Sequence, residues 1–395
     1  MSESVVIVDV LRTASGKGKP GGALSGVHPV QLLSETLKQL VERNGLDPVL
    51  VDDVIAGCVG QSGDQANNPA RTAALAAGFP VSVPGTTIDR QCGSSQQAVQ
   101  FAAAGIRSGD YDIVIACGVE SMSRVPMGSG RQNGSPMAPL ASRFPDGLVN
   151  QGVGAELIAG RHGFTRAQLD EFSARSHRLA AASRDLARSE IIDIKVTGED
   201  GAIRIHDSDE TVRSQTTAEG LAGLKPSYMK EEVATRFPEI AWSITPGNSS
   251  PLTDGASAAL IMSETKAAEL GLRARARVVA GTVVGSDPLT MLDGVVPATR
   301  KLLDRTGMSI DDFDTYEVNE AFAPVPLLWL KELGGDLDKL NPRGGAIALG
   351  HALGASGVRL LCTMVHHLEH SGGRFGLQTM CEGGGMANAT VIEAL

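Results

Sequence analysis

Several features that would place a protein in a common class are scarce in this sequence. The 395 residues carry a formal net charge of -10 and contain no block of lysine and arginine, so a general nucleic-acid-binding protein is not expected. No apolar run is long enough to span a bilayer, and the N-terminal residues lack the basic leader and long apolar core of a signal peptide. We therefore expect a cytoplasmic protein without a membrane segment.

Cysteine is also sparse, and its spacing argues against two further classes. The five cysteines stand far apart, so their pattern is neither the disulfide framework of a small secreted protein nor a CxxC-type metal site. A reducing cytosol fits this usage best, and we expect no bound metal. The five are Cys58, Cys92, Cys117, Cys362 and Cys381.

What is present is the composition of an ordinary globular protein, with 42% apolar and 20% charged residues. The length predicts two to three compact units. Short Val/Ile-rich runs alternate with Ala/Leu-rich helical patterns, and this alternation predicts α/β layering. The first four such segments are 4–10, 29–43, 53–57 and 71–77.

The texture changes in the middle of the chain, where Gly-, Pro-, Met- and Ser-rich stretches precede a polar helix and a charged segment. The α/β texture resumes at about residue 276. We therefore expect a first half over 1–120, an inserted loop domain over 121–250 and a second half over 251–395.

The two halves resemble each other in the order of their segments. Each contains a Gly/Ser-rich loop, an amphipathic helix, a turn with glycine and a buried strand that ends at cysteine. If the halves pack about a pseudo-twofold axis, Cys92, His351 and Cys381 lie near equivalent ends of helices and strands. The repeat therefore predicts that these three residues meet in one site.

Each of the three residues has a catalytic and a structural interpretation. Cys92 precedes a helical segment, and the positive end of a helix dipole lowers the pKa of a thiol, although a small buried cysteine at a turn fits the same pattern. His351 lies in a glycine-rich loop and could take a proton from a thiol, or it could be a structural histidine. Cys381 precedes three glycines, which would expose a thiol and free backbone N–H groups, or it could be a buried cysteine before a turn.

Two short motifs point to other functions but lie in the wrong context. The GxGxxG pattern at 16–21 contains Pro20 and is followed by Gly22, Gly26 and Pro29. It therefore does not open directly into the helix that dinucleotide binding needs. The HxxEH pattern at 366–370 lies in the last turn of a helix and has no evident acidic ligand downstream.

Four sequence blocks resemble the thiolase family over essentially the full length. They are QCGSSQQA at 91–98, NEAFA at 319–323, GGAIALGHALGASG at 344–357 and CEGGG at 381–385. The resemblance implies a five-layered α/β/α/β/α fold of two similar halves with an inserted loop domain that binds coenzyme A. It also implies an acyl-CoA C-acetyltransferase, which performs thiolytic cleavage of 3-ketoacyl-CoA or the reverse Claisen condensation.

The resemblance assigns roles to individual residues. Cys92 would carry the acyl group, His351 would accept its proton, and Cys381 would exchange a proton with the α-carbon. One oxyanion hole would be formed by His351 with a water on Asn319, and another by the backbone N–H groups of Cys92 and Gly383. The residues expected to contact the substrate or coenzyme A are Arg213, Ser250, Tyr228, Phe322, Ala321, Met291, Asn150 and Gln151.

Departures from the family pattern bear on the substrate. Ala352 stands where the family has proline, which leaves the orientation of the His351 loop open. Asn150-Gln151 replaces the His-Met pair of many acetoacetyl-CoA thiolases, which favours a longer or bulkier 3-ketoacyl chain. Acetoacetyl-CoA synthesis or cleavage and an inactive acyl-CoA-binding homologue are the alternatives. The resemblance further implies coenzyme A as substrate, no other cofactor, a homodimer or homotetramer, and a place in the beta-oxidation of fatty acids.

Overall fold

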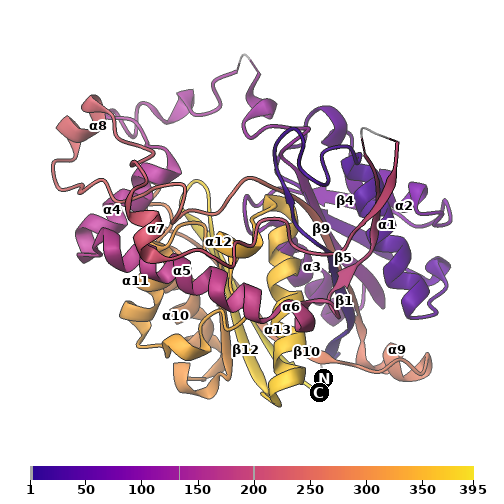
Figure 1. The fold of residues 1–395 in the computed structure, drawn as a ribbon. Coiled ribbons are helices and arrows are strands. Elements are labelled where there is room, and N and C mark those ends of the chain that lie inside the picture. Colours follow the sequence, from indigo (N-terminus) through magenta and orange to yellow (C-terminus); the bar gives the residue numbers. More distant parts are fainter. Residues whose placement is uncertain (1–2, 133, 199–200) are drawn as a thin grey trace.

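The computed structural model describes residues 3–132, 134–198 and 201–395, and its helices and strands follow the predicted alternation (Figure 1). The predicted helix at 29–43 coincides with α1, and the predicted strand at 53–57 coincides with β3. The elements of the first half are β1 (Val5–Thr13), β2 (Gly16–Lys17), α1 (Pro29–Arg43), β3 (Asp53–Gly57), α2 (Pro69–Ala76), β4 (Gly85–Ile88), α3 (Ser94–Ser108), β5 (Ile113–Ser121), β9 (Thr253–Ser263) and α9 (Glu264–Glu269).

The second half repeats most of this order. Its elements are β10 (Ala276–Gly285), α10 (Val295–Thr306), β11 (Thr315–Val318), α11 (Pro324–Leu333), α12 (Ala346–Leu349), α13 (Ser356–Ser371), β12 (Phe375–Glu382) and β13 (Met386–Ala394). Between β5 and β9 the chain forms α4 (Gln151–His162), α5 (Arg166–Ala182), α6 (Arg184–Ala187), β6 (Ile191–Ile192), β7 (Ile194–Thr197), β8 (Ile203–His206), α7 (Ala218–Ala222) and α8 (Glu231–Arg236).

Strand pairing confirms the predicted repeat. The first half has the order β4-β3-β5-β9-β1, and the second has β11-β12-β13-β10. One parallel pair occupies the same place in both halves, β3 with β5 in the first and β11 with β12 in the second. The next two pairs in each order are antiparallel, β5-β9 and β9-β1 in the first half and β12-β13 and β13-β10 in the second. A short antiparallel contact between β1 and β10 joins the two sheets.

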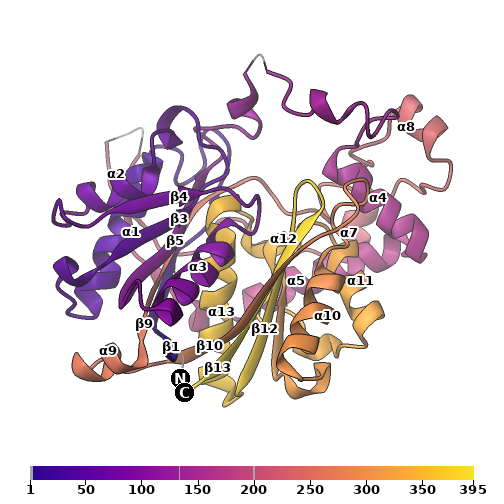
Figure 2. The same cartoon turned by 180° about the vertical axis from the view of Figure 1, so that it is seen from behind.

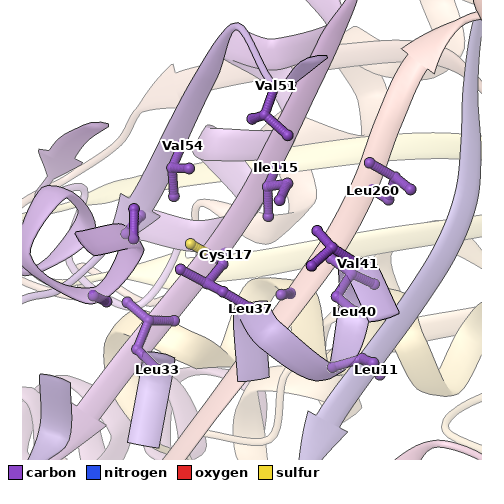
Figure 3. Packing of buried hydrophobic residues seen from close by; sticks show 14 of the residues in the cluster. Leu11, Leu33, Leu37, Leu40, Val41, Val51, Val54, Ile115, Cys117 and Leu260 are labelled. Carbon is purple, nitrogen blue, oxygen red and sulfur yellow. The ribbon is translucent and has the colours of Figure 1, made fainter. Parts of the chain in front are cut away.

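The helices form three layers around these sheets, which confirms the α/β/α/β/α class. Helices α3 and α13 run side by side between the sheets, whereas α1 and α2 cover the outer face of one sheet and α10 and α11 that of the other (Figure 2). A separate apolar cluster joins the helices of each layer to the strands they cover. In the first, leucines of α1 such as Leu33 and Leu37 pack on Val54, Ile115 and Leu260 of β3, β5 and β9 (Figure 3).

One strand crosses an expected division of the chain. β9 follows residue 250, yet it pairs with β1 and β5 of the first half. The first sheet is therefore completed by a strand that the sequence pattern placed in the second half. The reason is that the α4–α8 region is inserted before the last strand of the repeat, and the domain limits at 120 and 250 stay a prediction.

In the described parts of the chain, no helix is both long and apolar enough to cross a membrane.

Candidate active site

The beginnings of the two central helices bring the predicted residues together. Cys92 lies two residues before α3, and His351 lies in the loop that leads to α13. The helices approach so closely here that a Cβ at Gly357 would lie 2.1 Å from the backbone nitrogen of Gln96. The backbone N–H of Val358 donates to the Ser95 hydroxyl at 3.0 Å.

Cys381 joins this site from the end of β12. It is fully buried, and burial is the main cause that raises the pKa of its thiol. A negative charge on the Cys92 sulfur is the second cause and raises the pKa of Cys381 further. The thiol of Cys381 is therefore neutral at physiological pH and has a proton to give.

The predicted lowering of the pKa of Cys92 is wrong. The side chain is 4% exposed and packs with Leu360 and Met380, so burial raises its pKa to about 12, and the Glu382 charge acts in the same direction. The backbone N–H groups of Cys92 and Gly383 hydrogen bond to the sulfur and lower its pKa, but they do not offset burial. The thiol needs a base before it can act as a nucleophile.

His351 is suited to be that base. Burial, together with the charge of Arg359, lowers its pKa to about 3, so the imidazole is neutral and can accept a proton. Its Nδ1 lies 2.6 Å from the Ser356 hydroxyl, which itself donates to the carbonyl of Ala352 at 2.8 Å. Since this donation uses the hydroxyl proton, the ring proton is on Nδ1, and Nε2 carries the lone pair.

The same contacts determine the orientation of the histidine loop. The backbone N–H of His351 donates to the Thr253 hydroxyl at 2.9 Å, and Ser356 holds the carbonyl of Ala352. These bonds fix the loop where the family proline is replaced by alanine.

Asn319 faces the other ring nitrogen. Its Nδ2 lies 3.3 Å from His351 Nε2, and its backbone N–H donates to the carbonyl of Thr379. The Asn319 Oδ1 atom is buried without a hydrogen-bond partner among the described residues. A buried, unpaired acceptor of this kind can hold a water molecule, as the predicted role of Asn319 requires.

Most of the residues predicted to bind coenzyme A lie close to one another. The Ser250 N–H donates to the carbonyl of Ala321 at 3.0 Å, and the ring of Phe322 meets that of Tyr228 edge-on with centroids 6.2 Å apart. The Tyr228 ring packs against Gly152, next to Gln151. These contacts place the 248–250 segment, the NEAFA block and the start of α4 side by side.

Gln151 links this group to the catalytic loops. Its Nε2 atom and the Oε1 atom of Gln91 each lie 2.9 Å from the position that a Cβ would take at Gly383. Asn150 is exposed and caps α4 by accepting from the N–H of Gly152 at 2.9 Å. Met291 is buried, with a positive φ of 44°, in the same apolar cluster as Phe322 and Cys381.

Arg213 is not placed in contact with this group. Its side chain is exposed, and its backbone N–H donates to His177 Nδ1 on α5 at 3.1 Å. A role toward the nucleotide therefore stays a prediction.

Comparison with known proteins identifies the family. A model of the thiolase N-terminal domain matches residues 5–265, and one of the thiolase C-terminal domain matches residues 272–394. The chain belongs to the thiolase family.

Individual thiolases resemble the chain over its whole length. A steroid 3-ketoacyl-CoA thiolase of Mycobacterium tuberculosis, FadA6, is 46% identical over 100% of this chain and 95% of its own length. A 3-ketoacyl-CoA thiolase of Photobacterium profundum is 44% identical over 99% of both chains. The crystal structure of the Bacillus anthracis acetyl-CoA acetyltransferase has a TM-score of 0.89 at 38% identity and covers 100% of this chain and 99% of that one.

The two motifs that pointed elsewhere lie outside this thiolase site. The GxGxxG segment begins with β2, and the next α-helix, α1, starts only at Pro29. His366 Nδ1 lies 2.9 Å from the carbonyl of Cys362 within α13, and Glu369 pairs with Arg275. Among the described residues, no group of three or more His, Cys, Asp or Glu side chains is placed to hold a metal ion.

Sequence reasoning missed several residues that support the thiolase site. Glu320 accepts from Ser176, Asn341 and the N–H of Ile347, and so joins the NEAFA block to α5 and α12. Ser356 and Glu382 were also missed. Glu320, Ser356 and Glu382 all lie inside the four family blocks. Their presence was therefore visible in the sequence, whereas their neighbours in space, such as Ser176 and Asn341, were not.

Proposed function

We propose that the protein is a degradative thiolase that uses coenzyme A to cleave 3-ketoacyl-CoA into acetyl-CoA and an acyl-CoA shortened by two carbons. One observation supports this proposal: the thiols of Cys92 and Cys381 are buried and interact, and His351, a neutral imidazole with its lone pair on Nε2, lies before the helix that packs on the one after Cys92. These are a nucleophile, a base and an acid in the protonation states that the reaction needs.

In the first half-reaction, His351 takes the proton of Cys92 and the thiolate adds to the 3-keto carbon. The bond between C2 and C3 then breaks, its electron pair forms the enolate of acetyl-CoA, and Cys381 protonates C2. The backbone N–H groups of Cys92 and Gly383, which point at the Cys92 sulfur, would stabilise the oxyanion on C3. Protonated His351 and a water on Asn319 would stabilise the enolate oxygen.

In the second half-reaction, coenzyme A replaces acetyl-CoA. Its thiol gives its proton to the Cys381 thiolate and attacks the acyl-Cys92 thioester. Cys92 leaves as thiolate and regains its proton from His351, which restores the starting state of the site. The reaction uses side chains and backbone of this chain, with coenzyme A as a substrate and no further cofactor. Ping-pong kinetics follow from the covalent intermediate.

We propose an acyl chain longer or bulkier than that of acetoacetyl-CoA, as part of a beta-oxidation type of sequence. The names of the Mycobacterium and Photobacterium relatives and the Asn150-Gln151 pair support this choice. Acetoacetyl-CoA cleavage or synthesis is the second candidate, favoured by the name of the Bacillus relative. We also propose that the protein acts in the cytoplasm as a homodimer or homotetramer. Thiolysis rates across 3-ketoacyl-CoA chain lengths, steroid-like acyl groups included, decide between the candidates.

The covalent step has a direct test. Incubation with acetyl-CoA should add one acetyl group, found on Cys92 by mass spectrometry of the intact protein and its peptides. Cys92→Ser should lose this label, whereas Cys117→Ala, which changes a buried cysteine on the far side of β5, should keep it. A label on another residue, or no label on folded wild-type protein, contradicts the proposal.

The role of the second thiol can be tested separately. Cys381→Ala should still be acetylated on Cys92, because His351 is intact, but it should lose most carbon–carbon bond cleavage, since general acid catalysis contributes roughly 10²- to 10⁴-fold. Label incorporation and thiolysis are measured on the same preparation. Loss of acetylation in this variant would assign Cys381 to the first proton transfer instead.

A further inference from the structure

A buried carboxyl group that the mechanism does not use lies directly behind the nucleophile. Glu382 is the last residue of β12 and follows Cys381, and its side chain extends to the loop of Cys92. A Cβ at Gly93 would lie 2.0 Å from Glu382 Oε1 and 2.7 Å from Asn388 Nδ2. The carboxyl group therefore packs against the residue that caps α3.

Nothing in the described chain hydrogen bonds to this carboxyl group. Both of its oxygens are buried without a partner, and the Asn388 amide nitrogen beside them donates to the Gly93 carbonyl at 3.0 Å. The Nε of Arg90, the cation that faces Glu382, is also unpaired. A buried carboxylate that accepts no hydrogen bond is costly, so this geometry favours the neutral acid.

The charged and titratable groups around Glu382 come from two elements. Arg90, Asp89 and Cys92 belong to the loop before α3, and Cys381 belongs to β12. Burial is the main cause that raises the pKa of Glu382, to about 8, while Arg90 lowers it and Asp89 raises it. The carboxyl group thus changes charge just above neutral pH, within reach of both catalytic thiols.

We propose that Glu382 is a positioning residue for the nucleophile, whose neutral form permits the thiolate at Cys92 and whose ionised form opposes it. This rests on the proposed role of Cys92 in acyl transfer. The negative charge of ionised Glu382 acts on the same sulfur that must become negative, so it raises the pKa of Cys92 and also that of Cys381.

The sign of the pH effect follows from this charge. Below about pH 8 Glu382 is neutral and does not hinder transfer of the Cys92 proton to His351. As the pH rises through that value, the carboxylate forms and acetylation of Cys92 slows. If the carboxylate raises the pKa of Cys92 by about one unit, which is about 1.4 kcal/mol, the rate falls roughly tenfold.

Glu382→Gln keeps the shape of the side chain and removes its charge, so it provides the first test. Two rates are measured from pH 6.5 to 10: acetylation of Cys92 by acetyl-CoA, and alkylation of Cys92 by iodoacetamide followed by peptide mass spectrometry. In the wild type, acetylation should fall above about pH 8. In Glu382→Gln this fall should disappear, and alkylation at pH 9 should be roughly tenfold faster. Glu382→Asp, which keeps a carboxyl group, should retain the fall.

A second variant supports the test if Glu382→Gln does not fold. Arg90→Gln removes the cation that lowers the pKa of Glu382, so the alkaline fall in acetylation should shift to higher pH. Unchanged alkaline behaviour in either folded variant overturns the proposal. The proposed function fails separately, if wild-type Cys92 is not acetylated at any pH.

Discussion

At the scale of single residues, the site depends on protonation states that neighbours impose. His351 is neutral because it is buried beside Arg359, and its lone pair is on Nε2 because Ser356 occupies Nδ1. Ser356 therefore acts on the reaction through the histidine and touches no reacting atom in the proposed mechanism.

Removal of this hydroxyl should impair the base. We expect Ser356→Ala to lower kcat for acetyl transfer by roughly 10- to 100-fold, a part of what general base catalysis contributes, with little change in KM. The reason is that neither the tautomer nor the ring orientation of His351 is then fixed. Steady-state kinetics measure both constants. Ser257→Ala is the matched control, because Ser257 is equally buried and donates to the Ala355 carbonyl without contacting His351. Equal kcat in the two variants would remove Ser356 from the mechanism.

The sequence predicted which residues meet but not their chemical state. Cys92, His351 and Cys381 follow from local blocks and from the repeat. The pKa of Cys92 does not, because it depends on Leu360, Met380 and Glu382, which are more than 250 positions away in the chain. Burial of this kind outweighs a helix dipole, whose effect is typically about 0.3–1 kcal/mol.

At the scale of elements, the contact between α3 and α13 determines the distance between nucleophile and base. Helices such as α1 were predictable from local periodicity, but this contact was not, since it needs the pseudo-twofold packing of the halves. The same limit explains β9, whose partners β1 and β5 are far from it in sequence.

Gly357→Ala tests this helix contact. The new Cβ would meet the backbone nitrogen of Gln96, which cannot rotate away as a side chain can, so the helices must separate. We expect a loss of about 1–3 kcal/mol in unfolding free energy, typical of overpacking. Activity should fall by roughly 100-fold, because a displacement near 1 Å is enough to misalign reacting groups. Denaturant unfolding and thiolysis assays measure the two effects. In Gly130→Ala, where a Cβ meets open space, both should be unchanged.

At the scale of the whole molecule, a buried charged group joins the three parts of the chain. Glu190, which follows α6 in the inserted region, contacts Arg12 of β1 at 2.9 Å and Arg343 of the second half at 2.6 Å. Thr363 of α13 donates to the same carboxylate at 3.3 Å. All four side chains are buried, so their charges are poorly screened by water.

Glu190→Gln should therefore destabilise the fold far more than the loss of a surface ion pair. The substitution leaves the buried guanidinium group of Arg343 facing a neutral amide, whereas Arg12 keeps its pair with Asp209 at 2.8 Å. Breaking a buried ion pair typically costs about 3–5 kcal/mol. Equilibrium unfolding in urea measures this loss. Glu264→Gln is the control, because Glu264 pairs with Arg277 at 3.0 Å near the surface, where a salt bridge contributes under about 1 kcal/mol. If the two variants unfold at the same urea concentration, Glu190 does not hold the inserted region to the two halves, and their apolar clusters alone account for the assembly.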